Sequence, residues 1–204
     1  MIDEAARKQL PDEVRNRLAR YAAPLGVEEP TYILLDGPMA FLRGGATDRY
    51  VTDGLDGGFV AGWRALVTMH DELRPLLLPP EEDQPVLPPL TAEATPQAGM
   101  DLVDDAIAVL TSDAAGDAVG PSVLAAMTAA REYFEAAQAQ ITAQPGLVRR
   151  GMRAVGGMLG LIVTATNLGA ATVAITAWAV TPQGQAVIAA LAPIFQSILK
   201  LFGG

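Results

Sequence analysis

The kind of fold open to this chain is decided by residues 147–180, LVRRGMRAVGGMLGLIVTATNLGAATVAITAWAV. Three arginines stand near the start of this stretch, and 46 uncharged residues then separate Arg153 from Lys200. A helix rises ~1.5 Å per residue, so about 20 such residues cross the ~30 Å hydrocarbon core of a bilayer. The uncharged run is therefore long enough for two membrane-spanning helices.

The uncharged run is interrupted by TPQGQ at 181–185, whose residues favour a turn. This turn separates two predicted helical arms, 154–180 and 186–202, which together form an apolar hairpin. The arginines precede the first arm and Lys200 lies near the end of the second. Both charged ends are therefore expected on one side, which agrees with the positive-inside rule for a protein whose body is cytoplasmic.

Insertion of the first arm into lipid is expected to be marginal and therefore conditional. The window 155–177 holds eight Val, Leu or Ile residues, which supply about −2.4 to −4.8 kcal/mol at roughly −0.3 to −0.6 kcal/mol each. Four glycines, four threonines and Asn167 oppose insertion. The second arm is shorter, contains Pro193 and ends in the amphipathic pattern IFQSILKLF, which is as typical of an interfacial helix as of a spanning one.

The residues predicted to carry function lie on this hairpin or directly before it, and two sets of them face the membrane surface. The predicted contacts to anionic headgroups are Arg149, Arg150, Arg153 and Lys200. The predicted interfacial apolar residues are Trp178, Phe195 and Phe202. Basic residues at the mouth of an apolar segment, and aromatic residues near its ends, are what the polar boundary of a bilayer attracts.

A third set forms a small, mildly polar face on the first arm. Its members follow one another at spacings of four, four, three and four residues: Gly156, Gly160, Thr164, Asn167 and Ala171. Such a face lets helices approach closely in lipid or lines a wet lumen. The alternative is that it packs against the second arm, in a hairpin permanently buried in a soluble helical bundle.

Charge is distributed unevenly along the chain. All 23 acidic residues lie at or before Glu135, together with ten of the 14 basic ones, and the remainder holds four basic residues and no acid. An acidic body argues against a nucleic-acid partner, because phosphate contact needs a basic face. The partner expected for the basic C-terminal part is an anionic lipid membrane.

Composition and the first residues limit the remaining classes. The chain has no cysteine, which excludes disulfides, thiol catalysis and cysteine-based zinc sites. Its first 22 residues are dense in both charges, so we expect neither a secretory signal nor a transit peptide. The expected location is cytoplasmic, in association with the inner membrane.

The predicted fold class is mainly α with a small β element. Residues 1–78 are predicted to form a small α+β domain, 79–98 a proline-rich linker and 99–204 a helical domain that ends in the apolar hairpin. In the first domain, residues 2–22 are predicted to be helical, with a fresh helix start after Pro11. The stretch at 31–58, TYILLDGPMAFLRGGATDRYVTDGLDGG, alternates β-prone runs with glycine and proline turns, which predicts a hairpin or meander.

Helices are predicted for most of the remaining chain. An amphipathic helix is expected from Phe59, with these residues on its apolar side: Phe59, Trp63, Leu66, Val67, His70, Leu73 and Leu77. A short acidic helix is expected at 100–111, and Pro121 opens a longer one that Gln144-Pro145-Gly146 ends. The apolar stripe of that longer helix is Val123, Leu124, Met127, Ala130, Phe134, Ala137 and Ile141.

No pattern in the sequence predicts a catalytic residue, a metal or a cofactor. His70 is the one histidine, and we interpret it as a hydrogen-bonded core or boundary residue rather than a catalyst. The motifs SILK at 197–200 and GGMLG at 156–160 lack the neighbouring strand and partner motifs of the enzymes that use similar patterns. We therefore expect a protein that is not an enzyme.

Two clusters of aspartate residues are considered as cation-binding sites. Asp53 and Asp56 lie in DGLDGG, which lacks the ligand spacing of an EF-hand and is interpreted as a glycine-rich turn. Asp101, Asp104 and Asp105 share one helix face. We interpret these three as acids of a first helical turn that offset the helix dipole, with a divalent ion as the alternative.

In arrangement, soluble helices followed by a C-terminal apolar hairpin resemble the pore-forming domains of the colicin type. The likeness is one of arrangement, without motifs that match residue by residue, and region 30–58 has no counterpart there. It implies a bacterial effector that permeabilises membranes, as a homo-oligomer when inserted and under the control of a regulatory protein partner. The alternatives are a membrane-anchored interaction module and a soluble assembly protein whose apolar tail is buried in a partner or oligomer.

Overall fold

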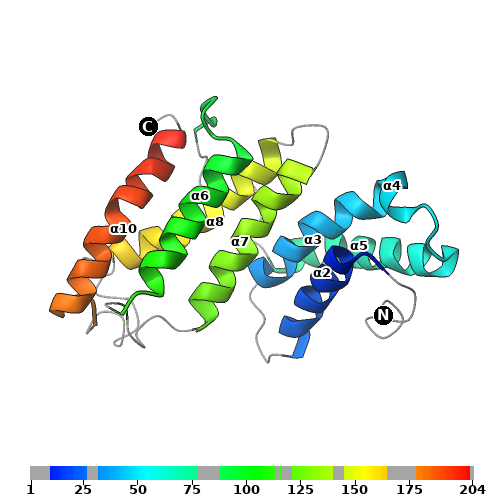
Figure 1. Ribbon diagram of the computed structural model, residues 1–204, viewed down its shortest axis with the longest axis horizontal. Coiled ribbons are helices and arrows are strands. Elements are labelled where there is room, and N and C mark those ends of the chain that lie inside the picture. The colour runs from blue at the N-terminus through cyan, green and yellow to red at the C-terminus, as the bar shows by residue number, and fades with distance from the viewer. Residues whose placement is uncertain are drawn as a thin grey trace. The chain divides into compact units, whose positions relative to one another are not determined.

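The computed structural model describes residues 10–26, 32–77, 88–113, 115, 121–139, 145–164 and 178–202. These residues are mostly helical and contain no strand (Figure 1). The chain divides into two compact units, Met1–Val86 and Leu87–Gly204. This boundary falls inside the predicted linker 79–98, and each unit is described here by itself.

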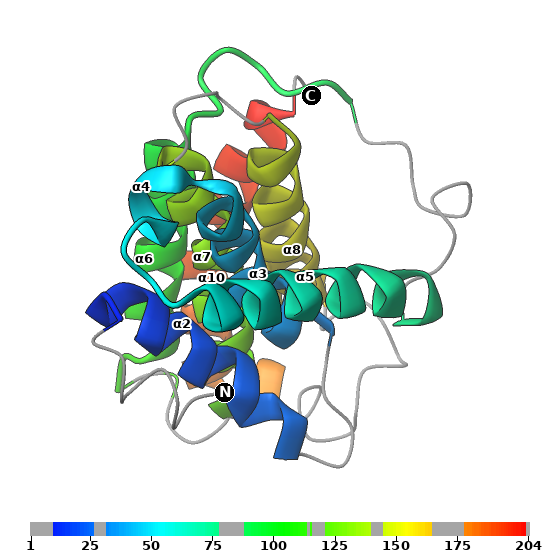
Figure 2. The same ribbon diagram turned by 90° about the vertical axis from the view of Figure 1, so that its right-hand side faces the viewer.

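The described residues of the first unit form three long helices and two short ones. Its elements are α2 Asp12–Ala22, η1 Ala23–Gly26, α3 Tyr32–Thr47, α4 Arg49–Thr52 and α5 Gly57–Leu77. Helix α3 packs against both α2 and α5, and α5 lies across α3 in the view of Figure 2. Trp63 from α5 and Met39 and Leu42 from α3 are fully buried at the centre of its core. The predicted helix start after Pro11 and the predicted helix from Phe59 are both confirmed.

The predicted hairpin or meander at 31–58 is wrong, because its described residues form α3, α4 and the turn that leads into α5. Four buried residues follow helical spacings of four, three and four: Leu35, Met39, Leu42 and Ala46. Pro38 and Gly45, which suggested turns, lie inside α3. A Cβ atom on Gly45 would stand 2.9 Å from the Trp63 ring, so this glycine serves helix packing rather than a turn. Burial of the α3 stripe outweighs the low helix propensity of Gly and Pro.

The second unit is an antiparallel bundle of four described helices. They are α6 Pro96–Leu110, α7 Pro121–Ala139, α8 Pro145–Thr164 and α10 Pro182–Leu201. Each packs against its two neighbours, with α10 closing the ring against α6, and the colour sequence in Figure 1 shows neighbouring helices running in opposite directions. The predicted start of a helix at Pro121 is confirmed. Pro145, which was predicted to end that helix, instead begins α8.

Helices α6, α7 and α8 meet at the ring of Phe134, which is fully buried. A Cβ atom on Gly99 of α6 would stand 2.3 Å from this ring, and one on Gly151 of α8 would stand 2.5 Å from it. No side chain fits at such distances, because atoms in protein interiors are packed at van der Waals contact. The absence of side chains at these two positions is therefore what lets the ring enter between the helices.

Alanine substitution of two glycines in α8 tests this packing. Gly151→Ala is expected to lower the free energy of unfolding by about 1–3 kcal/mol, because the new methyl group overpacks the core. Gly157 is exposed with no atom near its Cβ position, so Gly157→Ala is expected to be neutral or to stabilise by up to about 1 kcal/mol. Urea denaturation measures both, and equal effects would contradict the role given to Phe134.

Candidate functional site

The candidate site is the pair of helices α8 and α10, which we call the apolar pair. The two helices pack side by side in opposite directions (Figure 1). A Cβ atom on Gly156 would lie 3.3 Å from Ile198, and one on Gly160 would lie 3.4 Å from Phe195. The small face predicted on the first arm therefore contacts the second arm at these two glycines. Thr164 ends α8, and its side chain, like Asn167 and Ala171, lies outside the described residues.

Helix α10 has the length and composition of a membrane-spanning segment. It is 20 residues long, its mean hydropathy reaches 1.4, and it alone meets this criterion within the described part of the chain. The buried core helix of a soluble protein meets the same criterion, but only 33% of the apolar window in α10 is buried. Exposure thus separates α10 from a mostly buried core helix.

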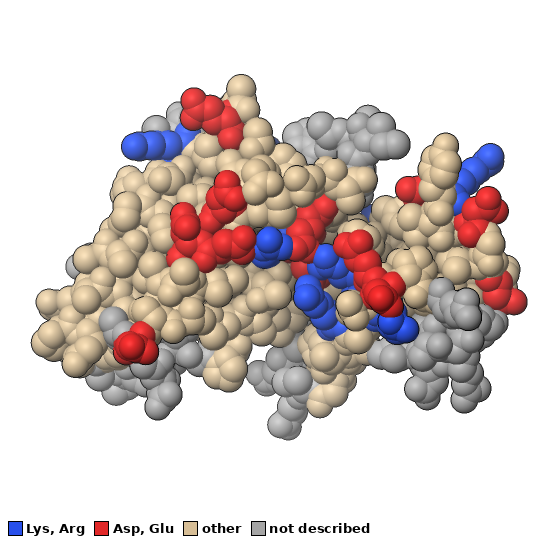
Figure 3. Space-filling view, viewed as in Figure 1, with Lys and Arg blue, Asp and Glu red and all other residues tan. Residues whose placement is uncertain are grey.

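The outer face of α10 is uncharged along almost its whole length. Its exposed residues before the last turn are Pro182, Gln183, Gln185, Ala186, Ala189, Ala190, Pro193, Gln196 and Ser197. Its inner face buries Val187, Leu191 and Ile198. In Figure 3 the surface over α10 is tan apart from a basic group at its upper end, whereas acidic and basic groups gather over α6 and α7. Most water-facing helices carry charged residues on the exposed side, and α10 has its one charge at Lys200.

A tight turn at Trp178–Thr181 precedes α10, whereas residues 182–185 of the predicted turn form the first turn of the helix. The Thr181 hydroxyl accepts a hydrogen bond from the Gly184 backbone N–H at 3.0 Å and donates one to the Trp178 carbonyl at 2.7 Å. A Cβ atom on Gly184 would stand 2.1 Å from the Trp178 carbonyl oxygen. The helix begins at Pro182, four residues earlier than the predicted start of the second arm.

The predicted headgroup contacts gather at one end of the bundle. Arg149, Arg150 and Arg153 lie within the first half of α8, and Lys200 lies in the last turn of α10. Because the two helices run in opposite directions, the start of α8 and the end of α10 are at the same end (Figure 1). The three arginines are half-buried and Lys200 is exposed. Cations near a helix N-terminus oppose the helix dipole, so the helix itself does not favour the arginines there.

The predicted interfacial residues are only partly accessible in this conformation. Trp178 and Phe195 are half-buried, and Phe202 is buried at 6% exposure. Sequence reasoning missed Val180 beside the turn, which is 63% exposed. Leu199, within the amphipathic pattern IFQSILKLF, is 42% exposed. The clearest apolar exposure at the ends of α10 therefore comes from aliphatic side chains.

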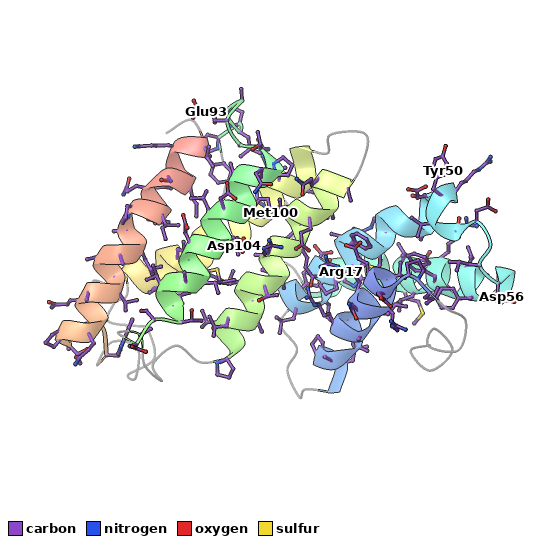
Figure 4. All side chains as sticks on the ribbon, in the orientation of Figure 1. Arg17, Tyr50, Asp56, Glu93, Met100 and Asp104 are labelled. Atoms are coloured by element: carbon purple, nitrogen blue, oxygen red, sulfur yellow. The ribbon has the colours of Figure 1, made fainter. Side chains whose placement is uncertain are left out.

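One acidic residue of α6, Asp104, ties this helix to α7. Helix α6 begins at Pro96, so Asp101, Asp104 and Asp105 all lie beyond its first turn, and that interpretation of them is wrong. The Arg131 Nε of α7 donates to Asp104 at 2.8 Å, and Arg131 also pairs with Glu135. Figure 4 shows Asp104 on α6, facing α7. Within the described residues, no cluster of three or more potential ligands could hold a metal ion.

His70 lies in a buried polar network of the first unit. It is fully buried, with Nε2 at 3.0 Å from the Asp36 carboxylate and Nδ1 at 3.3 Å from the Tyr21 hydroxyl. The Tyr32 hydroxyl donates to the same carboxylate at 3.0 Å, and its ring stacks on the imidazole. These contacts join α2, α3 and α5, and they agree with the interpretation of His70 as a hydrogen-bonded core residue.

The remaining motifs have local structural roles. Asp56 accepts a hydrogen bond from the Phe59 N–H at 3.0 Å at the start of α5, and Gly54 has a positive φ of 79° in the preceding turn. Asp53 and Asp56 thus belong to a turn and a helix start. In SILK, the Ser197 hydroxyl donates to the Pro193 carbonyl within α10, and GGMLG lies inside α8.

Comparison with known proteins adds no relative: no family model matches the chain, and neither the curated proteins nor the solved structures contain a significant match.

Substitutions at the start of α10 test the turn. Gly184→Ala is expected to lower the free energy of unfolding by about 1–3 kcal/mol, because its methyl group overlaps a backbone carbonyl that cannot rotate away. The neighbouring Gln185 is exposed, so Gln185→Ala is expected to change stability by less than about 0.5 kcal/mol. Hydrogen exchange of the amides at 182–187 reports the effect locally, and unchanged protection in Gly184→Ala would refute it.

Alkaline pH is expected to weaken the first unit through Tyr21. Burial raises the pKa of the Tyr21 hydroxyl above its ordinary value. The unfolded chain therefore ionises first, so this contribution to stability is complete below about pH 10 and is lost as the pH rises through the higher folded pKa. The measurement is urea unfolding from pH 8 to 11, followed by Trp63 fluorescence in a Trp178→Phe background.

Two tyrosine variants separate this effect from general alkaline damage. Tyr21→Phe is expected to flatten the alkaline fall in stability and to cost about 1 kcal/mol at pH 8, because it removes a buried hydrogen bond. Tyr50 is 93% exposed, so Tyr50→Phe is expected to leave the pH profile unchanged. The same slope in all three proteins would show that Tyr21 does not contribute to it.

Proposed function

We propose that the protein is a membrane-active effector whose apolar pair is covered by α6 and α7 in water and enters an anionic lipid bilayer. The observation that carries this proposal is the uncharged, largely exposed face of α10 on a helix long enough to span a membrane. The outer face of this helix carries no charge before Lys200, so its entry into lipid moves no ionised group into the hydrocarbon. One apolar helix near the C-terminus is a possible anchor by itself, and insertion of the pair is the further step proposed here.

The direction of entry follows from the placement of charge. Arg149, Arg150, Arg153 and Lys200 are at one end of the pair, and the turn at Trp178–Thr181 before α10 carries no charge. Moving a basic side chain to the bilayer centre costs about 2.5–3.5 kcal/mol on insertion scales. The pair can therefore enter with the turn leading while its four charges remain among the headgroups, and the proposed site of action is the cytoplasmic face of the inner membrane.

The contacts within the pair suit both environments. Gly156 against Ile198 and Gly160 against Phe195 are close contacts between helices at small residues, which is how helices associate in lipid. The contacts that entry must break are those of α8 with α6 and α7 and of α10 with α6. Entry thus separates the apolar pair from α6 and α7. These two helices carry the ion pairs Asp104–Arg131 and Arg131–Glu135 and remain in water. Association of several inserted pairs would form the permeable structure.

A second candidate is an assembly protein that buries the outer face of α10 against another protein. The same uncharged exposed face supports it, together with Leu199 at 42% exposure, because apolar surface is buried as readily by protein as by lipid. The third possibility, a permanent membrane anchor for the first unit, differs from the effector in leaving the bilayer intact.

Dye leakage from anionic-lipid vesicles tests the proposal with two matched lysine variants. Ala190 is exposed at the middle of α10, and Ala108 is exposed on α6. Ala190→Lys is expected to reduce leakage at least about tenfold, because a lysine at mid-membrane costs about 2.5–3.5 kcal/mol. Ala108→Lys adds the same charge to a helix that stays in water, so its leakage is expected to match that of the unmodified protein.

The outcomes distinguish the candidates. Equal leakage by the two lysine variants would contradict insertion of α10. Vesicle binding without leakage, weakened by Ala190→Lys, would identify an anchor. A protein that leaves vesicles untouched and forms a stable soluble oligomer, disrupted by Ala190→Lys but not by Ala108→Lys, would identify an assembly protein.

A further inference from the structure

The segment Pro88–Thr95, which we call the strap, precedes α6 at the same end of the bundle as the charged ends of the apolar pair (Figure 1). Figure 4 shows Glu93, one of its residues, at that end of the bundle. The strap contains a turn in which the Ala94 N–H donates to the Thr91 carbonyl at 3.1 Å. It is the first described segment of the second unit, so the first unit is joined to the bundle through it.

The strap holds the end of α10 by a backbone hydrogen bond. The Thr91 N–H donates to the Leu201 carbonyl at 2.9 Å. Leu201 is the last residue of α10, and the last four carbonyl groups of a helix have no partner within that helix. The bond therefore joins the strap to a carbonyl that the helix leaves available. Leu201 and Phe202 are buried here, so the contact lies where α10 meets the rest of the bundle.

The strap also contacts α8 and continues directly into α6. The Arg149 guanidinium of α8 donates to the Pro88 carbonyl at 3.4 Å. At the other end of the strap, the Thr95 hydroxyl accepts from the Ala98 N–H at 3.1 Å and caps α6. One short segment thus joins both helices of the apolar pair to a helix that covers them.

We propose that the strap is a latch that keeps the apolar pair covered, and that opening it controls entry into the membrane. This inference rests on the proposed function. Because the strap continues into α6, the Thr91–Leu201 bond resists separation of α10 from α6. Arg149 is held by the strap and is also a proposed headgroup contact, so anionic lipid competes with Pro88 for the same guanidinium. A partner that acts on the first unit reaches the latch through the chain that joins them.

A proline exchange tests the latch. Thr91→Pro removes the N–H that bonds to Leu201, and its leakage rate is expected to rise about two- to tenfold, the range that one net hydrogen bond represents in an equilibrium constant. Ala92 is exposed and takes the second position of the strap turn, where proline is favoured. Ala92→Pro is therefore the matched control, with leakage expected within about twofold of the unmodified protein.

A reversible crosslink tests the opposite direction and does not depend on the proline variant folding. The chain has no cysteine, and the hydrogen bond between residues 91 and 201 brings their backbones within the reach of a disulfide. The oxidised Thr91→Cys/Leu201→Cys protein is expected to lose leakage activity at least about tenfold and to regain it on reduction. The reduced form of the same protein is its own control.

The results separate a failure of the latch from a failure of the proposed function. Leakage that Ala190→Lys suppresses but that neither Thr91→Pro nor the disulfide alters would overturn the latch and leave the function standing. Absence of leakage in every protein, Thr91→Pro and the reduced double variant included, would overturn both. Leakage by Thr91→Pro above the level of Ala92→Pro, together with suppression by the disulfide, supports both.

Discussion

The second unit depends on the entry of one aromatic ring between two glycines. Phe134 of α7 is enclosed by Gly99 of α6 and Gly151 of α8, at distances that leave no room for a side chain on either glycine. This contact fixes the positions of three of the four helices. It also fixes the rotation of α8 about its own axis. At 3.6 residues per turn, Gly156 and Gly160 lie about 140–180° around α8 from Gly151. Helix α8 therefore packs against α7 through the face that contains Gly151, and against α10 through the opposite face, which contains Gly156 and Gly160.

The bundle separates charge between its two helix pairs. Helices α6 and α7 share the ion pair Asp104–Arg131 and display acidic groups to water, whereas α8 and α10 contact each other through glycine, isoleucine and phenylalanine. The first pair suits an aqueous surface, and the second has no charge between Arg153 and Lys200. The division of roles in the proposed mechanism follows from this separation, because the apolar pair has its four charges at one end and the rest of it can leave water uncharged.

The first unit is organised differently, around a polar centre within an apolar core. His70, Asp36, Tyr21 and Tyr32 bond to one another where α2, α3 and α5 meet. Buried polar groups are tolerated only when hydrogen-bonded, and the directional bonds of this network select one arrangement of the three helices. Because His70 is fully buried in this network, the single histidine of the chain is part of the core of this unit.

The sequence by itself determined those features that depend on composition and on nearby residues. These include the uncharged C-terminal run, the turn before α10, the helix start at Pro121 and the uneven distribution of charge. Only the tertiary structure decided that α3 is a helix. The glycine and proline residues of α3 favour turns, and packing such as that of Trp63 against Gly45 outweighs this local preference. The tertiary structure also decided that Gly156 and Gly160 contact α10, that Phe202 is buried and that Thr91 bonds to Leu201. Each of these depends on contact between residues far apart in the chain, and no local pattern encodes which distant partner a residue will meet.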